Sequence, residues 1–381
     1  MKNENLLLLH FGLPKTGTTS LQSFLKLNKK KLHELGWCYP DLNKEYYLHE
    51  EYPEQEKNGY LLDFFYMNSW ENESRELWAI IKRKLKTSNV IISEESFWGG
   101  DEECVFKKLQ SFKKQYSNIK VILYLRRQDL ALESLWCSLV DLRMYDKDIL
   151  ECYEETKDRY FAYLKKIKAI EKAIGRSNLI IRVYEKNQFE GTRNDVISDF
   201  LHVLGKMYSP LLQGNDWEYP ERQNVKLSDY ALSYALEYNR EFNKYSRNKS
   251  LQPEIQMSNR ELSRLTDDGG RGRYLNLIQR KNLLDSYANE NETIAREYLN
   301  REDGKLFYND CVEYTLWKKQ EFTELDRKII SIMAKQAAEY SNRILLLREK
   351  NNKRGVIREL KRKYIKHKDI MRRRLWTIFP I

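Results

Sequence analysis

A lysine, two glycines and several hydroxyl residues lie together in the segment 6–22, which reads LLLLHFGLPKTGTTSLQ. Its apolar first part is typical of a strand buried on both faces. Apolar residues then recur at helical spacing as far as Gly36, where such a helix would end. A tight turn from strand to helix aims free backbone N–H groups and the positive helix end at one point. This chemistry suits a phosphate group.

The order of residues in this loop separates it from two common nucleotide-binding motifs. The ATPase loop GxxxxGK[ST] places its lysine directly before the hydroxyl residue that binds magnesium. Here Lys15 comes before Gly17 instead, in the sequence PKTGTT. The dinucleotide fingerprint GxGxxG does not fit either. A glycine-rich turn that binds no ligand is the plain alternative for this segment taken alone.

A second candidate phosphate site follows the apolar run 121–125. Arg126 comes directly after this run, and Ser134 lies eight residues further on, about two turns along an expected helix. Arginine supplies a planar, permanently charged fork for phosphate, and serine adds a hydroxyl donor. Arg127 would share this task or pair with an acid. The alternative is that both arginines are ordinary surface residues at a helix start.

Two carboxylates follow the apolar run 90–93. Adjacent carboxylates raise the pKa of one of them, toward the strength of a useful general base. We expect Glu95 to be this base and Glu94 to be its neighbour or a substrate contact. His10, at the end of the first strand, is the rival base. Helix capping by the acids and a structural role for the histidine are the alternatives.

The elements that must position these residues alternate between strands and helices. Such alternation is typical of βαβ units and a parallel sheet covered on both faces. The sequence therefore predicts an α/β fold, with a P-loop-type parallel sheet flanked by helices and a helical C-terminal extension. Ligands bind such sheets beyond the carboxyl ends of the strands. Strands are expected at about 6–9, 90–93, 121–125 and 179–183, and helices at about 21–35, 74–87, 103–116, from 129, 157–174, 193–204, 227–242, 275–299 and 323–349.

The domain organisation follows from the same pattern. We expect an α/β core over 1–205 and a helical part over 206–310, which together form one domain. A helical extension follows over 311–381. Neither an internal repeat nor a low-complexity linker interrupts the chain.

The composition indicates a soluble globular protein. The chain has 381 residues, of which 41% are hydrophobic and 32% charged. No apolar run approaches the ~20 residues of a membrane span, and the four leucines near the start are too few for a signal peptide. The five cysteines are scattered, so neither a disulfide framework nor a zinc site is indicated, and we expect no metal. The sequence predicts a cytoplasmic location.

The net charge of +11 is concentrated near the C-terminus. Residues 348–374 hold thirteen Lys and Arg and three acids, which leaves 54 basic and 53 acidic residues elsewhere. This distribution argues against a nucleic-acid-binding protein. Apolar residues at helical spacing in 350–381 fit a helix that binds an anionic membrane surface, here the inner face of the membrane. An oligomerisation arm and a solvated charge run are equal alternatives.

The loop with Lys15 and the pair of Arg126 and Ser134 together resemble the nucleotide-binding motifs of sulfotransferases that use 3′-phosphoadenosine 5′-phosphosulfate (PAPS). The resemblance covers about residues 6–310 and is to bacterial carbohydrate-type members in particular. It implies that Lys15 stabilises the departing phosphate oxygen, and that Arg126 and Ser134 hold the 3′-phosphate. The residues expected to hold the 5′-phosphate are Lys15, Thr16, Gly17, Thr18, Thr19 and Ser20.

Three shorter similarities complete the resemblance. The sequence VYEK at 183–186 is similar to the family's Tyr-Glu element, which implies that Tyr184 lies beside the adenine; an ordinary core tyrosine is the alternative. Residues 286–299 resemble a C-terminal helix of the bacterial members. Several carbohydrate-modifying members use a glutamate as base where cytosolic members have a histidine, which favours Glu95. The family's GxxGxxK loop is not reproduced, and the loop GGRGR at 269–273 is a weak substitute for it.

The activity that the resemblance implies is transfer of a sulfuryl group from PAPS to a hydroxyl or amino group of a carbohydrate. The acceptor is expected to be a surface polysaccharide or glycolipid precursor that packs against the aromatic and acidic stretch 46–78. One rival hypothesis is a P-loop kinase that acts on a small molecule or sugar. A second is a non-catalytic scaffold that binds nucleotide and acts through its basic tail.

Overall fold

The computed structural model describes residues 5–13, 16–42, 71–98, 101–143, 145–207, 216–220, 227–246, 259, 261–266, 273–339 and 342. Five predictions therefore fall wholly or partly outside the described residues: those on Lys15, on 46–78, on 269–273, on the helix 323–349 and on the tail 350–381.

The chain divides into two compact units. The first consists of Met1–Trp136, Asp148–Lys226 and Gly272–Leu316, and the second of Cys137–Lys147, Leu227–Arg271 and Trp317–Ile381. Each unit is described separately below. The expected boundary near residue 310 stays a prediction.

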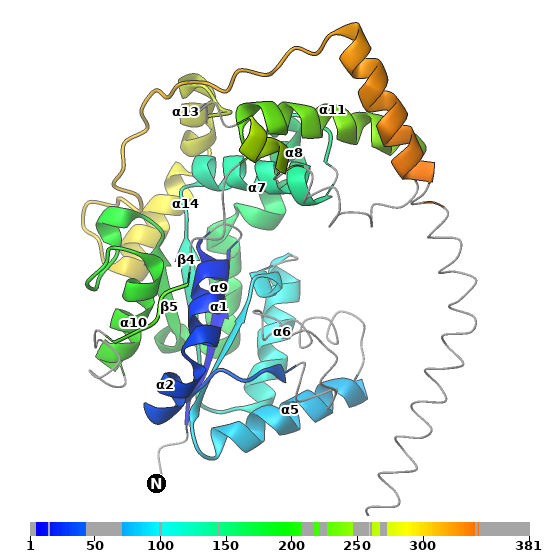
Figure 1. Ribbon diagram of the computed structural model, residues 1–381. Coiled ribbons are helices and arrows are strands. Elements are labelled where there is room, and N and C mark those ends of the chain that lie inside the picture. Colours follow the sequence, from blue (N-terminus) through cyan, green and yellow to red (C-terminus); the bar gives the residue numbers. More distant parts are fainter. Residues whose placement is uncertain are drawn as a thin grey trace, which may run out of the picture. The chain divides into compact units, whose positions relative to one another are not determined.

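A five-stranded parallel sheet forms the centre of the first unit, in the order β2-β3-β1-β4-β5 (Figure 1). The central strand, β1, pairs with β3 on one side and with β4 on the other. The chain builds one side of β1 first and then the other, so the strand order reverses at β1. In open α/β sheets ligands bind at such a reversal, beyond the carboxyl ends of the strands. The strands are β1 Leu7–Phe11, β2 Trp37–Cys38, β3 Asn89–Glu94, β4 Ile119–Leu125 and β5 Leu179–Val183.

The predicted α/β fold, with a parallel sheet flanked by helices and a helical C-terminal region, is confirmed. All four predicted strands are present, and β2 is an additional strand at the edge of the sheet. It has only two residues, which is too short for a hydrophobic period to indicate it.

Helices cover both faces of this sheet. The first unit contains α1 Thr18–Leu27, α2 Lys29–Glu34, α5 Glu71–Leu85, α6 Glu102–Gln115, α8 Ile149–Tyr160, α9 Tyr163–Ile174, α10 Val196–Met207, α13 Leu277–Asp285 and α14 Ala288–Thr293, which a π-helical turn at Ile294–Tyr298 follows. The helix α7, Gln128–Arg143, begins in the first unit and ends in the second.

Three of the expected helices are interrupted. The helix expected at 21–35 is broken at Asn28, whose side-chain amide donates to the carbonyl oxygens of Phe24 and Glu218 at 2.9 and 2.7 Å. The helix expected at 157–174 is divided between α8 and α9, and the one at 275–299 between α13 and α14. Apolar spacing continues across these breaks, so the period alone did not show them.

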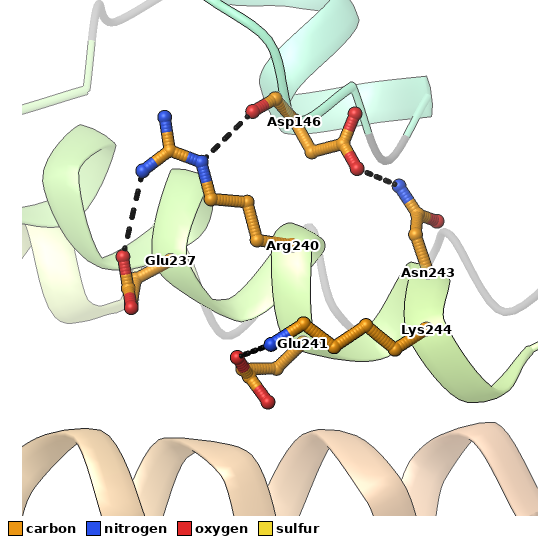
Figure 2. A pocket seen from close by; sticks show the side chains of 6 residues that line it. All are labelled: Asp146, Glu237, Arg240, Glu241, Asn243 and Lys244. Atoms are coloured by element: carbon orange, nitrogen blue, oxygen red, sulfur yellow. Dashed lines mark hydrogen bonds and ion pairs between the residues drawn. The ribbon is translucent and has the colours of Figure 1, made fainter.

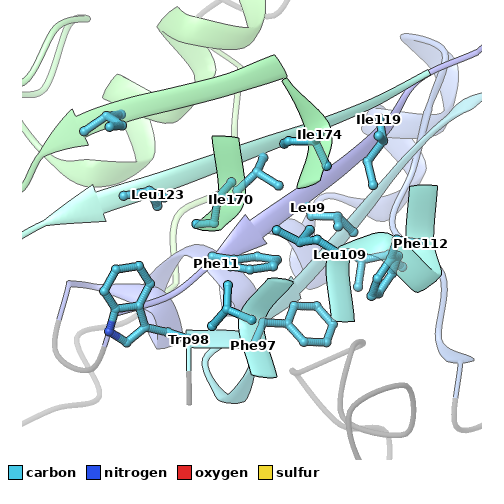
Figure 3. Close-up of a cluster of buried hydrophobic side chains, with 14 of the residues drawn as sticks. Leu9, Phe11, Phe97, Trp98, Leu109, Phe112, Ile119, Leu123, Ile170 and Ile174 are labelled. Carbon is cyan, nitrogen blue, oxygen red and sulfur yellow. The ribbon is translucent and has the colours of Figure 1, made fainter. Parts of the chain in front are cut away.

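Alternate residues of β1 enter two separate cores. Leu9 and Phe11 pack with residues of α6 and α9 on one face of the sheet (Figure 3). Leu8 packs with residues of α1 and α10 on the other face. This alternation is the period of two of a strand, with both faces buried as in other parallel sheets.

The second unit is built on α11, Asp229–Tyr245. Tyr238 and Phe242 of α11 pack against Ile330, Ala334 and Ala338 of the helix 324–339. No helix in the described ranges combines the length and the apolar character that crossing a membrane requires.

Lys166 of α9 is buried in the first unit, under the ring of Trp98. Its Nζ donates to the carbonyl oxygens of Trp98 (2.7 Å) and Arg159, and lies 4.8 Å from the centroid of the Trp98 ring. Burial lowers the pKa of Lys166 to about 7, and the positive charges of Arg159 and Lys108 act in the same direction.

We expect Lys166→Met to change how stability depends on pH. Between pH 7 and about 10 the unfolded chain carries a proton on Lys166 that the folded chain lacks, so the wild type gains stability as the pH rises. The free energy of unfolding of the variant minus that of the wild type should therefore fall by about 1.4 kcal/mol per pH unit. Urea denaturation of both proteins at several pH values measures this difference in the free energy of unfolding. Lys172→Met, at an exposed position on the same helix, is the control and should show no such slope. A difference that stays constant with pH would contradict a neutral, buried Lys166.

Candidate functional site

Four residues follow directly after the four longer strands. Glu95 follows β3, Gly12 follows β1, Arg126 follows β4 and Tyr184 follows β5. Since all the strands are parallel, these residues lie along one edge of the sheet, at and beside the reversal of strand order. This edge is the candidate site.

Gly17 is the N-cap of α1, and its backbone is left-handed, with φ 75° and ψ 16°. A Cβ at this position would lie 2.8 Å from Cγ1 of Val196 and 3.1 Å from Cε2 of Tyr184. Both the conformation and the space therefore require glycine. The same geometry presses the ring of Tyr184 against the backbone of the loop.

Within the described residues, no side chain neutralises the N-terminus of α1. Its first hydrogen bond runs from the N–H of Leu21 to the carbonyl of Gly17 at 3.0 Å, so the N–H groups of Thr18, Thr19 and Ser20 precede any intrahelical acceptor. No side chain caps the helix and no acid lies in its first turn. The Thr18 hydroxyl is buried and has no hydrogen-bond partner in the described ranges. An anion would satisfy all these donors.

Thr16 holds the loop closed from within. Its hydroxyl donates to the carbonyl oxygen of Leu13 at 2.8 Å, and its N–H donates to the same oxygen at 3.3 Å. These contacts give the Thr16 side chain a structural part in the loop. Lys15, between these two residues, is outside the described residues, so its role stays a prediction.

Arg126 lies beside the ring of Tyr184. The Arg126 Cζ is 5.6 Å from the centroid of this ring, and the N–H of Tyr184 donates to the carbonyl of Leu125 at 2.6 Å. The same ring also lies next to Gly17, so the Tyr184 side chain lies between the loop and Arg126. Burial lowers the pKa of Arg126, and the charge of Arg273 lowers it further against the opposing effect of nearby tyrosines. The positive charges of Arg126 and Arg273 therefore act on each other at this edge of the sheet.

Arg273 is held in place by a buried carboxylate, Glu133 of α7. The Nη1 of Arg273 lies 3.0 Å from Oε2 of Glu133. The other oxygen, Oε1, accepts hydrogen bonds from the backbone N–H groups of Tyr274 and Leu275 at 2.8 and 3.2 Å. This carboxylate therefore fixes both the backbone and the side chain of the segment that carries Arg273.

A buried ion network continues from Glu133. The fully buried Arg280 pairs with Glu133 and with Asp129, where Nη1 and Oδ2 are 2.6 Å apart. Arg127 also pairs with Asp129, at 2.7 Å, and donates to the carbonyl of Asn309 at 2.6 Å. Burial raises the pKa of Asp129, but hydrogen bonds from the two arginines outweigh this effect, and the net shift is downward. Of the two roles considered for Arg127, pairing with an acid is confirmed.

Ser134 lies on α7 one residue after Glu133, and its side chain is half-buried. Its hydroxyl forms no hydrogen bond with a residue of the described ranges, Arg126 included. Its assignment to a phosphate stays a prediction.

The two candidate carboxylates belong to consecutive residues, the last of β3 and the one after it. Glu94 ends β3 opposite Phe11, is buried, and accepts a hydrogen bond from the N–H of Gly12 at its backbone carbonyl (3.4 Å). A Cβ at Gly12 would lie 3.0 Å from Cγ of Glu95 and 2.6 Å from Oγ1 of Thr18. Glu95 and Thr18 therefore meet at Gly12, which puts Glu95 at the loop.

His10 belongs to a polar group behind the loop. Its Nδ1 lies 2.8 Å from the Ser93 hydroxyl oxygen, and the amide of Gln22 donates to the same oxygen at 3.2 Å. The ring meets Tyr124 and Phe200 edge-on, and burial lowers the pKa of His10 to about 3. These contacts describe a neutral histidine that joins β1 to α1 through Ser93 and Gln22. Its candidacy as base stays a prediction.

Sequence reasoning gave Gly12 no role of its own and missed the network of Asp129, Glu133 and Arg280. One signal was available, because Asp129 and Glu133 are four residues apart around the apolar run 130–132. This spacing puts both carboxylates on one helix face. Nothing local indicated Arg280 as their partner.

The second unit has a shallow depression lined by charged side chains (Figure 2). Arg240 pairs with Glu237 at 3.6 Å, and Lys244 pairs with Glu241. The Asn243 amide donates to the Asp146 carboxylate at 2.9 Å. These groups satisfy one another, so we do not regard the depression as the candidate site. Within the described ranges, no three His, Cys, Asp or Glu side chains are grouped so as to hold a metal ion.

Comparison with known proteins gives few relatives. No family model matches the chain. An uncharacterized protein from Archaeoglobus fulgidus is 26% identical over 259 residues, which cover 67% of this chain and 66% of that protein, slightly less than two thirds of its length. A crystal structure of a sulfotransferase from Alicyclobacillus acidocaldarius aligns with 62% of this chain and 91% of that chain, with 14% identity and a TM-score of 0.35. A likeness of this size carries no functional argument.

We expect Gly17→Ala to destabilise the protein more than Gly36→Ala. Both glycines have positive φ, 75° and 80°, so alanine costs about 1 kcal/mol at each. Only at Gly17 would the new Cβ also collide with Val196 and Tyr184, whereas nothing lies within 4 Å at Gly36. Overpacking adds about 1–3 kcal/mol. Chemical denaturation of both variants measures this difference, and equal losses would show that Tyr184 does not pack against the loop.

Proposed function

We propose that this protein is a PAPS-dependent sulfotransferase that transfers a sulfuryl group to a hydroxyl or amino group of a carbohydrate. The observation that carries the proposal is the contact of the Tyr184 ring with both Gly17 and Arg126. A nucleotide with phosphates at its 5′ and 3′ positions needs two anion sites, separated by little more than a ribose. The loop and Arg126, on either side of the Tyr184 ring, would supply these two sites.

The loop would hold the 5′ end of the nucleotide. The N–H groups at the start of α1 and the buried Thr18 hydroxyl supply donors, and Lys15 supplies a charge for the phosphate oxygen that departs. Positive charge at a leaving group is the main contribution that a protein makes to a loose, in-line displacement. Thr16 would support this site by keeping the turn closed.

Arg126 would hold the 3′-phosphate, with Ser134 as an additional donor. Arg273 is a second cation for the same phosphate, since its charge already acts on Arg126. Two arginines close together repel each other, and a doubly charged phosphate between them removes this cost. Tyr184 would offer its ring to the nucleoside, as expected from the sequence.

Glu95 would act on the acceptor. PAPS supplies the sulfuryl group: the bond from sulfur to the phosphate oxygen breaks, and a bond from sulfur to the acceptor oxygen forms. Glu95 takes the proton that the acceptor hydroxyl loses. Its position beside Gly12 and Thr18 supports this role over that of Glu94.

The carbohydrate acceptor is proposed from the sequence. It rests on the aromatic and acidic character of 46–78, of which 46–70 lie outside the described residues. Trp78, at the end of this stretch, is half-buried, and its ring packs edge-on against Phe112 at 4.8 Å. The acceptor, a polysaccharide or glycolipid precursor, is proposed to pack against 46–78.

We expect the protein to bind adenosine 3′,5′-bisphosphate in preference to adenosine 5′-monophosphate and to ATP with magnesium. Arg126→Gln should reduce the affinity for the bisphosphate by about tenfold to a hundredfold, the effect of losing a charged hydrogen bond, and leave that for the monophosphate nearly unchanged. Isothermal titration calorimetry measures both constants. The control is Arg264→Gln, at an exposed arginine that pairs with Glu261 in the second unit.

Three results would contradict the proposal in different ways. Tighter binding of ATP with magnesium would favour a kinase. Equal losses for both adenosine nucleotides in Arg126→Gln would remove the 3′-phosphate site. Bisphosphate binding without release of bisphosphate from PAPS, in the presence of acceptors, would favour the scaffold.

We expect Glu95→Gln to lower kcat by about a hundredfold or more, because it removes the general base, without changing the affinity for the bisphosphate. Glu94→Gln and His10→Gln are the comparisons, and the pH dependence of kcat is the second measurement. Loss of the acidic limb of the pH profile in Glu95→Gln identifies the base. Loss of that limb in one of the other two variants would show that the residue replaced there is the base.

A further inference from the structure

The helix 324–339 of the second unit has two apolar faces. One face, formed by Ile330, Ala334 and Ala338, packs against Tyr238 and Phe242 of α11. The helix is drawn in orange in Figure 1, and this contact uses one side of it.

The other side is exposed. Leu325, Ile329, Ile332 and Met333 have exposed fractions of 67, 46, 58 and 49%. Their spacing of four, three and one residues places them on one side of a helix. We call these four residues the exposed face. A group of large exposed apolar side chains marks a surface that binds another protein or a membrane.

The sequence that follows this helix is strongly basic. Residues 348–374 carry thirteen Lys and Arg and three acids, and 375–381 read LWTIFPI. On the helix, two exposed lysines occupy positions beside the exposed face: Lys328, which pairs with Glu324 at 2.7 Å, and Lys335, whose Nζ lies 5.6 Å from the centroid of the Tyr245 ring. Apolar side chains next to positive charge are complementary to one kind of surface, an anionic lipid bilayer.

We propose that the exposed face inserts into an anionic membrane surface. Stable attachment to a membrane generally takes two signals, such as an apolar group and a polybasic patch, and this chain has both in succession. A second copy of the chain is a poorer occupant. Four side chains per copy are far fewer than the roughly 20–30 residues that each partner contributes to a stable protein interface.

Sedimentation of the full chain with vesicles tests the proposal. Vesicles of phosphatidylcholine with phosphatidylglycerol should bind it, and vesicles of phosphatidylcholine alone should not. Replacing all four residues of the exposed face by serine should weaken binding to the anionic vesicles by about tenfold or more, since each buried methylene group contributes to membrane affinity. A matched control replaces Leu265 and Ile278, two apolar residues exposed elsewhere, by serine and should bind as the wild type does.

A second variant that lacks 350–381 separates the two signals. It should lose most of the salt sensitivity of binding, which the basic segment supplies. Unchanged vesicle binding by the four-serine variant would overturn the proposal, as would a dimer in sedimentation velocity that the same substitutions dissociate. Thermal melting and bisphosphate binding of the four-serine variant show that it is folded. Because no step uses PAPS, the vesicle result stands or falls separately from the sulfotransferase proposal.

Discussion

The contact between the Tyr184 ring and the backbone of Gly17 is the constraint on which the candidate site depends. It requires a glycine in the loop. It also requires β5 to end beside this glycine, so that Tyr184, the next residue, packs against it. Arg126 then lies against the same ring from the neighbouring strand β4. Packing against one ring thereby brings three separate parts of the sequence together at the candidate site.

The site combines two kinds of polar group that are treated differently by the fold. The charges that maintain structure, such as Asp129 and Arg280, are paired with each other in the core, where a lone charge would be costly. The donors at the start of α1 have no such partners within the helix, since no acid occupies its first turn. Such donors at a helix end are the groups that bind anions in other proteins.

Much of the fold could be predicted because the strands are short, continuous apolar runs, and the residues after them are polar. Parallel strands end at one edge of their sheet, so the order of residues alone was enough to group Arg126, Glu95 and the loop. The two-residue strand β2 and the break at Asn28 could not be predicted in this way, because tertiary hydrogen bonds cause them. Arg280 was equally invisible, since its partners Glu133 and Asp129 are 147 and 151 positions away.

These long separations have a consequence for how the protein matures. Until residues 273–280 leave the ribosome, Asp129 and Glu133 have no Arg280 to neutralise them, and α7 cannot settle in its final, dry environment. The sheet can form earlier, because its last strand ends at Val183. The ion network that holds Arg273 is therefore complete only when a loop of about 150 residues has closed.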